Sequence, residues 1–219
     1  MSMHRKLLLF LASAICIFGG MYVAYSALET LRTLDAVEAE RDGWQRPGDV
    51  LRALELKPGN SVVDLGSGAG YFTLKISPLV GNEGRVLAVD LRRLSLSFLW
   101  IRSVLRSPRN IRVAVGDEDD PHLEAGSADA VLISNTYHEF RNPRVMMEHV
   151  FAALRAGGRL VIVDRGPGGA AEGHEAPMEA VAQEIERGGF EIVDREEPFI
   201  HPPGDDPWWL LVARKPYQK

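Results

Sequence analysis

Ser-Val-Val-Asp-Leu-Gly-Ser-Gly-Ala-Gly-Tyr-Phe, residues 61–72, is the stretch that decides the fold. The apolar run at 61–65 predicts a short buried strand, and a helical pattern begins at Tyr71. Gly66, Gly68 and Gly70 stand between them at alternating positions. Glycine lets the backbone approach a ligand closely, and the free N–H groups of a helix N-terminus point toward it. The stretch therefore predicts a strand, a turn and a helix that together cradle a nucleotide.

The spacing of the glycines separates two classes of nucleotide site. A dinucleotide-binding fold carries G-x-G-x-x-G, and its third glycine allows the helix to pack closely on the strand. This chain has G-x-G-x-G, and Tyr71 occupies the place of the third dinucleotide glycine. The spacing argues against NAD, and a NAD-dependent reductase is kept as an alternative only.

The run from Asp64 to Tyr71, with Asp90 closing the next strand, resembles the bacterial class I S-adenosylmethionine (SAM)-dependent methyltransferases that act on small molecules. Residues 154–164, Leu-Arg-Ala-Gly-Gly-Arg-Leu-Val-Ile-Val-Asp, look like the same family. The resemblance covers residues 41–215. It implies SAM as the cofactor. It also implies an α/β fold built on a doubly wound, seven-stranded, mostly parallel sheet whose last strand is antiparallel.

Apolar runs and turn signals predict where the elements of this sheet lie. The predicted strands are 61–65, 85–89, 110–115, 129–134, 159–163, 190–195 and 208–214. The predicted helices are 47–56, 71–79, 94–105, 142–154 and 177–187. Because a tight loop at 201–207 joins the last two strands, they can pair antiparallel, as the resemblance implies.

The resemblance also implies which residues hold the cofactor. It assigns Asp64, Gly66, Ser67, Gly68, Gly70, Tyr71, Asp90, Leu91, Gly116, Asp117 and Asn135. A carboxylate at the position of Asp90 can accept hydrogen bonds from both ribose hydroxyls, although an acid there could also cap a helix. Asp117 matches the family's acid at the adenine amino group, and Asn135 the position that touches the methionine part of SAM.

The fourth predicted strand ends in Asn-Thr-Tyr-His-Glu-Phe, residues 135–140. Ligands of open α/β sheets bind beyond the carboxyl ends of the strands, so polar side chains here face the reacting groups. Tyr137, His138 and Glu139 are the candidates for catalysis. Imidazole changes its charge near neutral pH, so His138 could act as a general base, or it could only orient or pack. The absence of proline at 134–137 argues against a DNA amino-methyltransferase.

Five further residues are weaker candidates. Trp44 and Gln45 precede the first strand, where a segment of similar methyltransferases closes over the ligands; Trp44 could equally be a packing anchor. Arg165 could meet an anionic group of the substrate or lie on the surface. The glycine-rich loop 166–173 could act as a lid and bring His174 and Glu175 to the site.

The N-terminus predicts a membrane anchor. Residues 7–28 contain no charged side chain, and about 20 apolar residues span a bilayer core as a helix. We expect a single-pass anchor or signal segment at 1–28, an amphipathic connector at 29–46 and the methyltransferase domain at 47–219. Cleavage of a signal segment, with export, is the alternative. Basic residues flank the run on both sides, so their distribution does not predict the orientation of the anchor. Because SAM is a cytosolic metabolite, we expect the catalytic domain in the cytoplasm.

These patterns lead to one function and one alternative. We expect transfer of a methyl group to a small, lipid-soluble molecule such as a quinone or a lipid headgroup, because tethering raises the local concentration of membrane partners. The alternative is a SAM-binding sensor or scaffold without methyl transfer. The net charge of −5 gives no basic footprint for nucleic acid. The single cysteine, Cys16, excludes an intrachain disulfide and a cysteine-based metal cluster. No metal is expected, because the histidines lack ligand spacing, and the sequence predicts no oligomeric state.

Overall fold

The computed structural model describes residues 3–106, 109–166, 176–202, 204 and 206–217. The chain divides into two compact units, Met1–Glu40 and Arg41–Lys219. Residues 41–46, which the sequence assigned to the connector, belong to the larger unit. All the residues of the candidate site lie in this larger unit.

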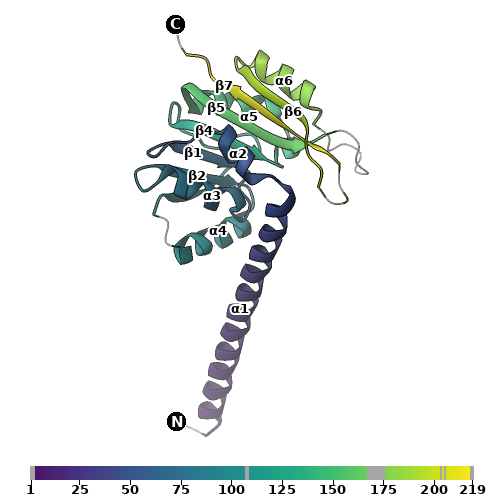
Figure 1. Ribbon diagram of the computed structural model, residues 1–219. Coiled ribbons are helices and arrows are strands. Elements are labelled where there is room, and N and C mark those ends of the chain that lie inside the picture. Colours follow the sequence, from purple (N-terminus) through teal and green to yellow (C-terminus); the bar gives the residue numbers. More distant parts are fainter. Residues whose placement is uncertain (1–2, 107–108, 167–175, 203, 205, 218–219) are drawn as a thin grey trace. The chain divides into compact units, whose positions relative to one another are not determined.

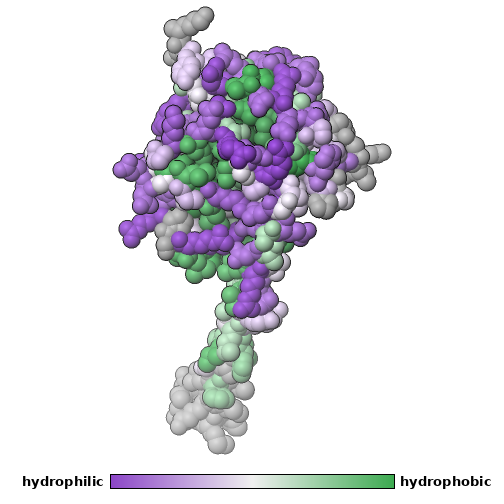
Figure 2. Space-filling model, viewed as in Figure 1, coloured by the Kyte–Doolittle hydropathy of each residue, from purple (hydrophilic) through white to green (hydrophobic). Residues whose placement is uncertain are grey.

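One helix, α1 (Met3–Trp44), forms the N-terminal unit and continues into the larger one. Apolar side chains of the N-terminal unit are exposed; Phe10, Ile15 and Phe18 keep 70%, 72% and 70% of their surface accessible. This apolar stretch is coloured green in Figure 2. Within the residues that the structure describes, no helix is both long and apolar enough to cross a membrane. The transmembrane helix predicted at 7–28 is therefore not supported.

The larger unit is built on a seven-stranded sheet in the order β3-β2-β1-β4-β5-β7-β6 (Figure 1). The strands are β1 (Ser61–Leu65), β2 (Arg85–Asp90), β3 (Ile111–Val115), β4 (Ala128–Ser134), β5 (Leu154–Arg165), β6 (Glu191–Ile200) and β7 (Trp208–Arg214). The pairs among β1 to β5 are parallel, and β7 is antiparallel to both β5 and β6. The predicted doubly wound, mostly parallel sheet with an antiparallel last strand is confirmed.

The register of the central strands brings distant residues to one edge. Leu65 of β1 pairs with Val89 of β2 and with Ile133 of β4. Ser134 of β4 pairs with Val163 of β5. The segments that follow these residues emerge side by side, and the strand order reverses between β1 and β4. A crevice outside the carboxyl ends at such a reversal is where open α/β sheets bind ligands.

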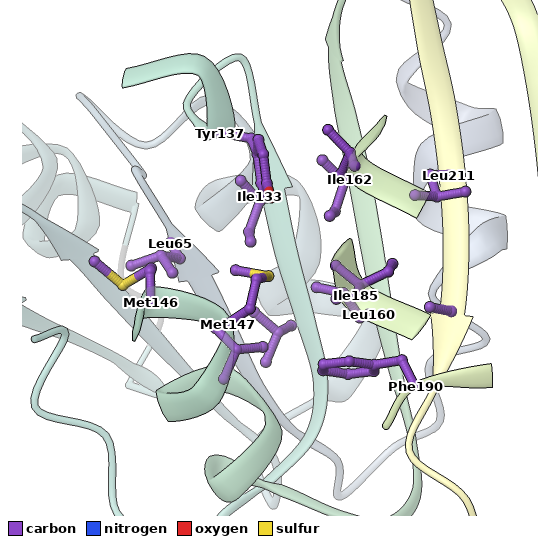
Figure 3. Packing of buried hydrophobic residues seen from close by; sticks show 14 of the residues in the cluster. Leu65, Ile133, Tyr137, Met146, Met147, Leu160, Ile162, Ile185, Phe190 and Leu211 are labelled. Carbon is purple, nitrogen blue, oxygen red and sulfur yellow. The ribbon is translucent and has the colours of Figure 1, made fainter. Parts of the chain in front are cut away.

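Helices cover both faces of the sheet. They are α2 (Pro47–Ala53), α3 (Tyr71–Val80), α4 (Arg93–Arg106), α5 (Pro143–Ala153) and α6 (Met178–Arg187), with the short 3₁₀ helix η1 (Tyr137–Glu139) after β4. Met147 of α5 and Ile185 of α6 pack with β5 on one face (Figure 3). Val50 of α2 and Ile76 of α3 belong to the cluster on the other face. Because the central strands are buried on both faces, their sequences are nearly continuous apolar runs rather than alternating ones.

Candidate functional site

The turn after β1 needs its glycines for two reasons. Gly66, Gly68 and Gly70 have φ values of 79°, 54° and 96°, a region that only glycine occupies without steric cost. A Cβ added to Gly66 would lie 2.2 Å from the Oγ1 of Thr136, and one on Gly70 would lie 2.3 Å from a methyl carbon of Leu99. A Cβ on Gly68 would meet nothing within 4 Å. Packing therefore fixes the two outer glycines, whereas Gly68 is open on the side where its Cβ would be.

Asp90, at the end of β2, is joined to this turn. The N–H of Gly68 donates to one of its carboxylate oxygens at 2.8 Å. The other oxygen accepts from the N–H of Arg92 at 2.7 Å. Asp90 is only 5% exposed. The carboxylate predicted to accept the ribose hydroxyls thus also shapes the glycine turn beside it.

A cavity of 320 Å³ opens next to Asp90, within the size range of small-ligand sites. Five predicted cofactor residues line it: Gly66, Asp90, Leu91, Gly116 and Asp117. The other lining residues are Leu65, Val89, Arg92, Glu118, Pro121, Thr136, Glu139, Phe140, Arg141 and Met146. The cavity therefore lies over the carboxyl ends of β1 to β4, as the strand reversal requires. The wall is mostly apolar and also carries carboxylates, which suits a nucleoside.

Ser67 adds a polar group that has no partner. The residue is 7% exposed, and its hydroxyl oxygen is buried without a hydrogen bond to any residue that the structure describes. Leaving a buried hydroxyl unpaired costs about 1–3 kcal/mol, which a bound ligand can recover. With the glycine turn and Asp90, this orphaned hydroxyl fits the adenosyl compound that the sequence implies.

Asp64 and Tyr71 stand behind the turn rather than in the cavity wall. Asp64 is buried in β1, and burial raises the pKa of its carboxyl to about 6. The hydroxyl of Thr73 donates to it at 2.5 Å. The Tyr71 hydroxyl donates to Asp42 at 2.8 Å, and the guanidinium of Arg41 lies 4.0 Å from the Tyr71 ring centroid. Both predicted residues therefore brace the glycine turn and its helix.

The segment before α2 packs onto the sheet. The rings of Trp44 and Trp208 meet edge to face with centroids 5.7 Å apart. Gln45 is fully buried; its amide oxygen accepts from the Nε of Arg41 at 2.7 Å, and its amide nitrogen lies 3.5 Å from the Oγ of Ser134. Trp44 is thus a packing anchor, while Gln45 reaches the end of β4.

The turn after β4 is organised by side chains from β5. Nδ1 of His138 lies 2.6 Å from Oδ1 of Asp164, and both side chains are almost completely buried. Asn135 has a φ of 53°, and its amide oxygen accepts from the Nε of Arg165 at 3.0 Å. Two predicted residues are therefore tied to β5. One is His138, predicted on the acceptor side, and the other is Asn135, predicted at the cofactor.

Tyr137 and Glu139 point to different surroundings. Tyr137 is 3% exposed, lies in the apolar cluster (Figure 3) and donates from its hydroxyl to Glu184 of α6 at 2.9 Å. Burial, with a smaller contribution from Glu184, raises the pKa of its phenol. Glu139 lines the cavity and lies 3.7 Å from the guanidinium of Arg92. Catalysis by Tyr137 stays a prediction that these contacts do not favour, and catalysis by Glu139 also stays a prediction.

Asp117 is the most exposed of the predicted cofactor residues. Its side chain is 77% accessible, and its carboxylate lies 3.0 Å from Nε2 of His122. Among the residues that the structure describes, no three His, Cys, Asp or Glu side chains gather as a metal site. His174 and Glu175, predicted near the site, lie outside the described residues, as does most of the loop 166–173.

Several residues of the site were not predicted. Thr136, Phe140 and Met146 line the cavity, and Asp164 holds His138. Thr136 and Phe140 lay inside the polar stretch after β4, so their place at the strand edge was the available signal. The pairing of Asp164 with His138 depends on β4 and β5 being neighbours, which no local pattern reveals.

The profile of a methyltransferase domain matches residues 56–193, well over half of the chain. Among solved structures, a SAM-dependent methyltransferase from Aquifex aeolicus has a TM-score of 0.71 and 21% identity. The match covers 85% of this chain and 97% of that one. At this identity the likeness concerns the fold, which is the one described above.

Two curated relatives match the central part of the chain. The "Ubiquinone/menaquinone biosynthesis C-methyltransferase UbiE" of Wigglesworthia glossinidia brevipalpis is 26% identical over 110 residues, which is 49% of this chain and 43% of that protein. "Protein-L-isoaspartate O-methyltransferase 1" of Arabidopsis thaliana is 34% identical over 113 residues, 49% of this chain and 46% of that protein. The chain thus spans less than half the length of these two relatives.

Proposed function

Because this chain belongs to the methyltransferase domain family, we propose that it is an enzyme that transfers the methyl group of SAM to a small molecule. The observation that carries the proposal is the hydrogen bond between Asp90 and the N–H of Gly68 beside the 320 Å³ cavity. It joins an acid suited to ribose hydroxyls with a turn whose backbone can approach the rest of the ligand.

Each part of the site has a role in holding SAM. The carboxylate of Asp90 would accept from the ribose hydroxyls, and the apolar wall that includes Leu91 and Met146 would hold the adenine ring. The turn at Gly66–Gly70, with the unpaired hydroxyl of Ser67, would meet the amino acid end. Bound SAM supplies a methyl group already activated by its sulfonium. The protein then has to align an attacking atom, and such positioning can lower a barrier by on the order of 7–11 kcal/mol in the best model systems.

The proposed acceptor is a small, lipid-soluble molecule of the quinone type. Two observations support this class. The matched relatives include a ubiquinone/menaquinone biosynthesis C-methyltransferase, although that match covers only 49% of this chain. The uncharged run at 7–28 would concentrate the protein near lipids.

The location is proposed on the sequence alone. We propose that the N-terminal unit associates with a membrane and leaves the methyltransferase domain in the cytoplasm. Fractionation of cells, followed by protease treatment of intact spheroplasts, measures both properties. Recovery of the full chain in the soluble fraction would contradict the proposal, and digestion from outside would support the exported alternative.

The test of the proposed function uses tritiated SAM, labelled in the methyl group, and an organic extract of the source membranes. We expect the purified protein to transfer label to one extractable compound, which mass spectrometry then identifies. The matched control is Asp90→Asn, which should transfer much less at the same SAM concentration. SAM binding without labelled product, in this extract and in a cytosolic extract, would favour the sensor or scaffold. Neither binding nor product would refute the proposal.

A further inference from the structure

His138 and Asp164 form a buried pair outside the cavity wall. Nδ1 of His138 lies 2.6 Å from Oδ1 of Asp164, and the two side chains are 6% and 0% exposed. The two residues are 26 positions apart in the sequence. They meet because β4 and β5 are parallel neighbours, with Ser134 opposite Val163.

Every other partner of the Asp164 carboxylate is a hydrogen-bond donor. Its Oδ2 accepts from the N–H groups of Thr136 and His138, each at 3.2 Å, and its Oδ1 accepts from the N–H of Arg165 at 2.7 Å. A carboxylate that receives three N–H groups acts as an acceptor toward the ring as well. In the neutral tautomer that this carboxylate favours, the hydrogen therefore sits on Nδ1 of His138 and Nε2 presents its lone pair.

The other ring nitrogen of His138, Nε2, is available to accept a proton. It makes no hydrogen bond to any residue in the part of the chain that the structure describes. Thr136 and Glu139, on either side of His138, line the cavity, but His138 itself does not. Through Nδ1 the ring meets Asp164 at the end of β5.

We propose that Asp164 is a positioning residue that holds Nε2 of His138 as the proton acceptor for the methyl-accepting group. The inference rests on the proposed function and sharpens it. The acceptor must then carry a removable proton on its attacking group, as a phenol, another hydroxyl or an acidic C–H does. A tertiary amine or a thioether has no such proton to lose.

The step balances in atoms and charge. The bond between the attacking group and its hydrogen breaks, and the proton goes to Nε2 of His138. The electron pair left behind forms the new bond to the methyl carbon, while the electrons of the old carbon–sulfur bond stay on sulfur. The sulfonium charge is lost as the imidazolium charge appears beside Asp164, and water later removes the proton from Nε2.

Other charged groups around the turn are already engaged. Glu139, in the same 3₁₀ helix, faces Arg92. Glu184 of α6 accepts from the hydroxyl of Tyr137, and the Nε of Arg165 in β5 donates to Asn135. Among the described residues, Asp164 is the charged group that forms a hydrogen bond or an ion pair with the His138 ring.

The first experiment reads the ring directly. In ¹⁵N-labelled wild-type protein at a pH where His138 is neutral, NMR of the histidine ring nitrogens should show hydrogen on Nδ1 and none on Nε2. His138→Gln assigns the signal. Hydrogen on Nε2 in the wild type would overturn the inference. Asp164→Asn should shift the ring toward the other tautomer, and calorimetry with SAM should confirm that the variant still folds and binds.

The second experiment asks whether the pair acts in the reaction, using tritiated SAM and the membrane extract as before. We expect His138→Gln and Asp164→Asn each to lower the rate on the order of a hundredfold or more. The double variant should be no slower than His138→Gln alone, and the wild-type rise of rate with pH should vanish in His138→Gln. The matched control is His149→Gln, a half-exposed histidine of α5 near Asp120, which should keep the wild-type profile.

The outcomes separate this inference from the proposed function. A purely structural pair would lower the rate through loss of folding, would leave the pH profile of the remaining activity unchanged, and would make the double variant slower than either single one. Those results overturn the base role, as would a rate for His138→Gln within twofold of the wild type. If the wild type binds no SAM and transfers no label, the proposed function fails and the base role falls with it.

Discussion

Two turns at the same edge of the sheet are built in different ways. The turn after β1 is shaped by backbone: three glycines with positive φ, and N–H groups that donate to Val89 and Asp90. The turn after β4 is shaped by side chains, because Asp164 holds His138 and Arg165 holds Asn135. In the proposed function, the first turn holds SAM and the second faces the methyl acceptor.

The contrast also divides the two turns by what substitutions should do. Changes in the glycine turn act on folding and on SAM binding, since the backbone itself is the site. Changes to His138 or to Asp164, which holds it, should leave SAM bound and alter the chemistry. Four tests sharpen or break this division.

The largest effect is expected for Gly66→Ala compared with Gly68→Ala. An alanine at 66 would be strained by the positive φ, and its Cβ would lie 2.2 Å from the Oγ1 of Thr136. The unfolding free energy should therefore drop by on the order of 3 kcal/mol or more. At 68 the Cβ meets nothing within 4 Å, and a loss of about 1 kcal/mol is expected. Urea unfolding of both variants checks the difference. Equal losses of unfolding free energy in the two variants would mean that contact with Thr136 is not what requires a glycine at position 66.

A similar magnitude is expected from the pH dependence of Asp64. Burial raises the pKa of its carboxyl from 3.8 to about 6, so between about pH 4 and 6 the folded state holds a proton that the unfolded state releases. Stability therefore falls as pH rises through this window, by on the order of 3 kcal/mol in all. Asp64→Asn carries no such charge.

The measurement for Asp64 is unfolding free energy of both proteins at pH 4, 5, 6 and 7. The stability of Asp64→Asn minus that of the wild type should grow from pH 4 to pH 6 and then level off. A difference that stays constant from pH 4 to pH 7 would show that folding does not raise the pKa of Asp64.

The third effect concerns Asp90. Hydrogen bonds to a charged group contribute about 1.5–3 kcal/mol each, so Asp90→Asn should weaken SAM binding on the order of a hundredfold. Asp119→Asn, in the exposed acidic turn after β3, is the matched control and should keep the wild-type affinity. Calorimetry measures both. An unchanged affinity in Asp90→Asn would remove the ribose role from this carboxylate.

The smallest effect is expected for Tyr137→Phe. The ring stays in the core and only the hydrogen bond to Glu184 is lost, so unfolding free energy should fall by about 1 kcal/mol. The rate and its pH dependence should match those of the wild type. A loss of activity much larger than the loss of stability would instead support the catalytic assignment made from the sequence.

Much of the fold and of the cofactor side could be predicted from the sequence. Strand and helix positions follow from apolar periodicity, and Gly66, Gly68 and Asp90 sit at fixed distances along one strand–turn–helix unit. The position of the β4 turn could be predicted, but the contacts of its side chains could not. Tyr137 stood beside His138 among polar residues, and only the packing of α6 shows that it is buried.

Asp164 illustrates the limit most clearly. It closes a strand that the sequence predicts, yet its partner lies 26 residues earlier and is reached only through the pairing of β4 with β5. The boundaries of β5 differ for a related reason. The predicted strand begins at Arg159, whereas the observed one begins at Leu154, because Ala128 of β4 pairs with Leu154 across a bulge. Strand pairing is a non-local property, and local patterns do not contain it.

The central claim is that the glycine turn and Asp90 together hold SAM. Calorimetric titration of the purified full-length wild-type protein with SAM, and in parallel with NADH, tests it most directly. The account predicts saturable binding of one SAM per chain and no heat of binding with NADH. Binding of NADH, or no binding of SAM by folded protein, would contradict it.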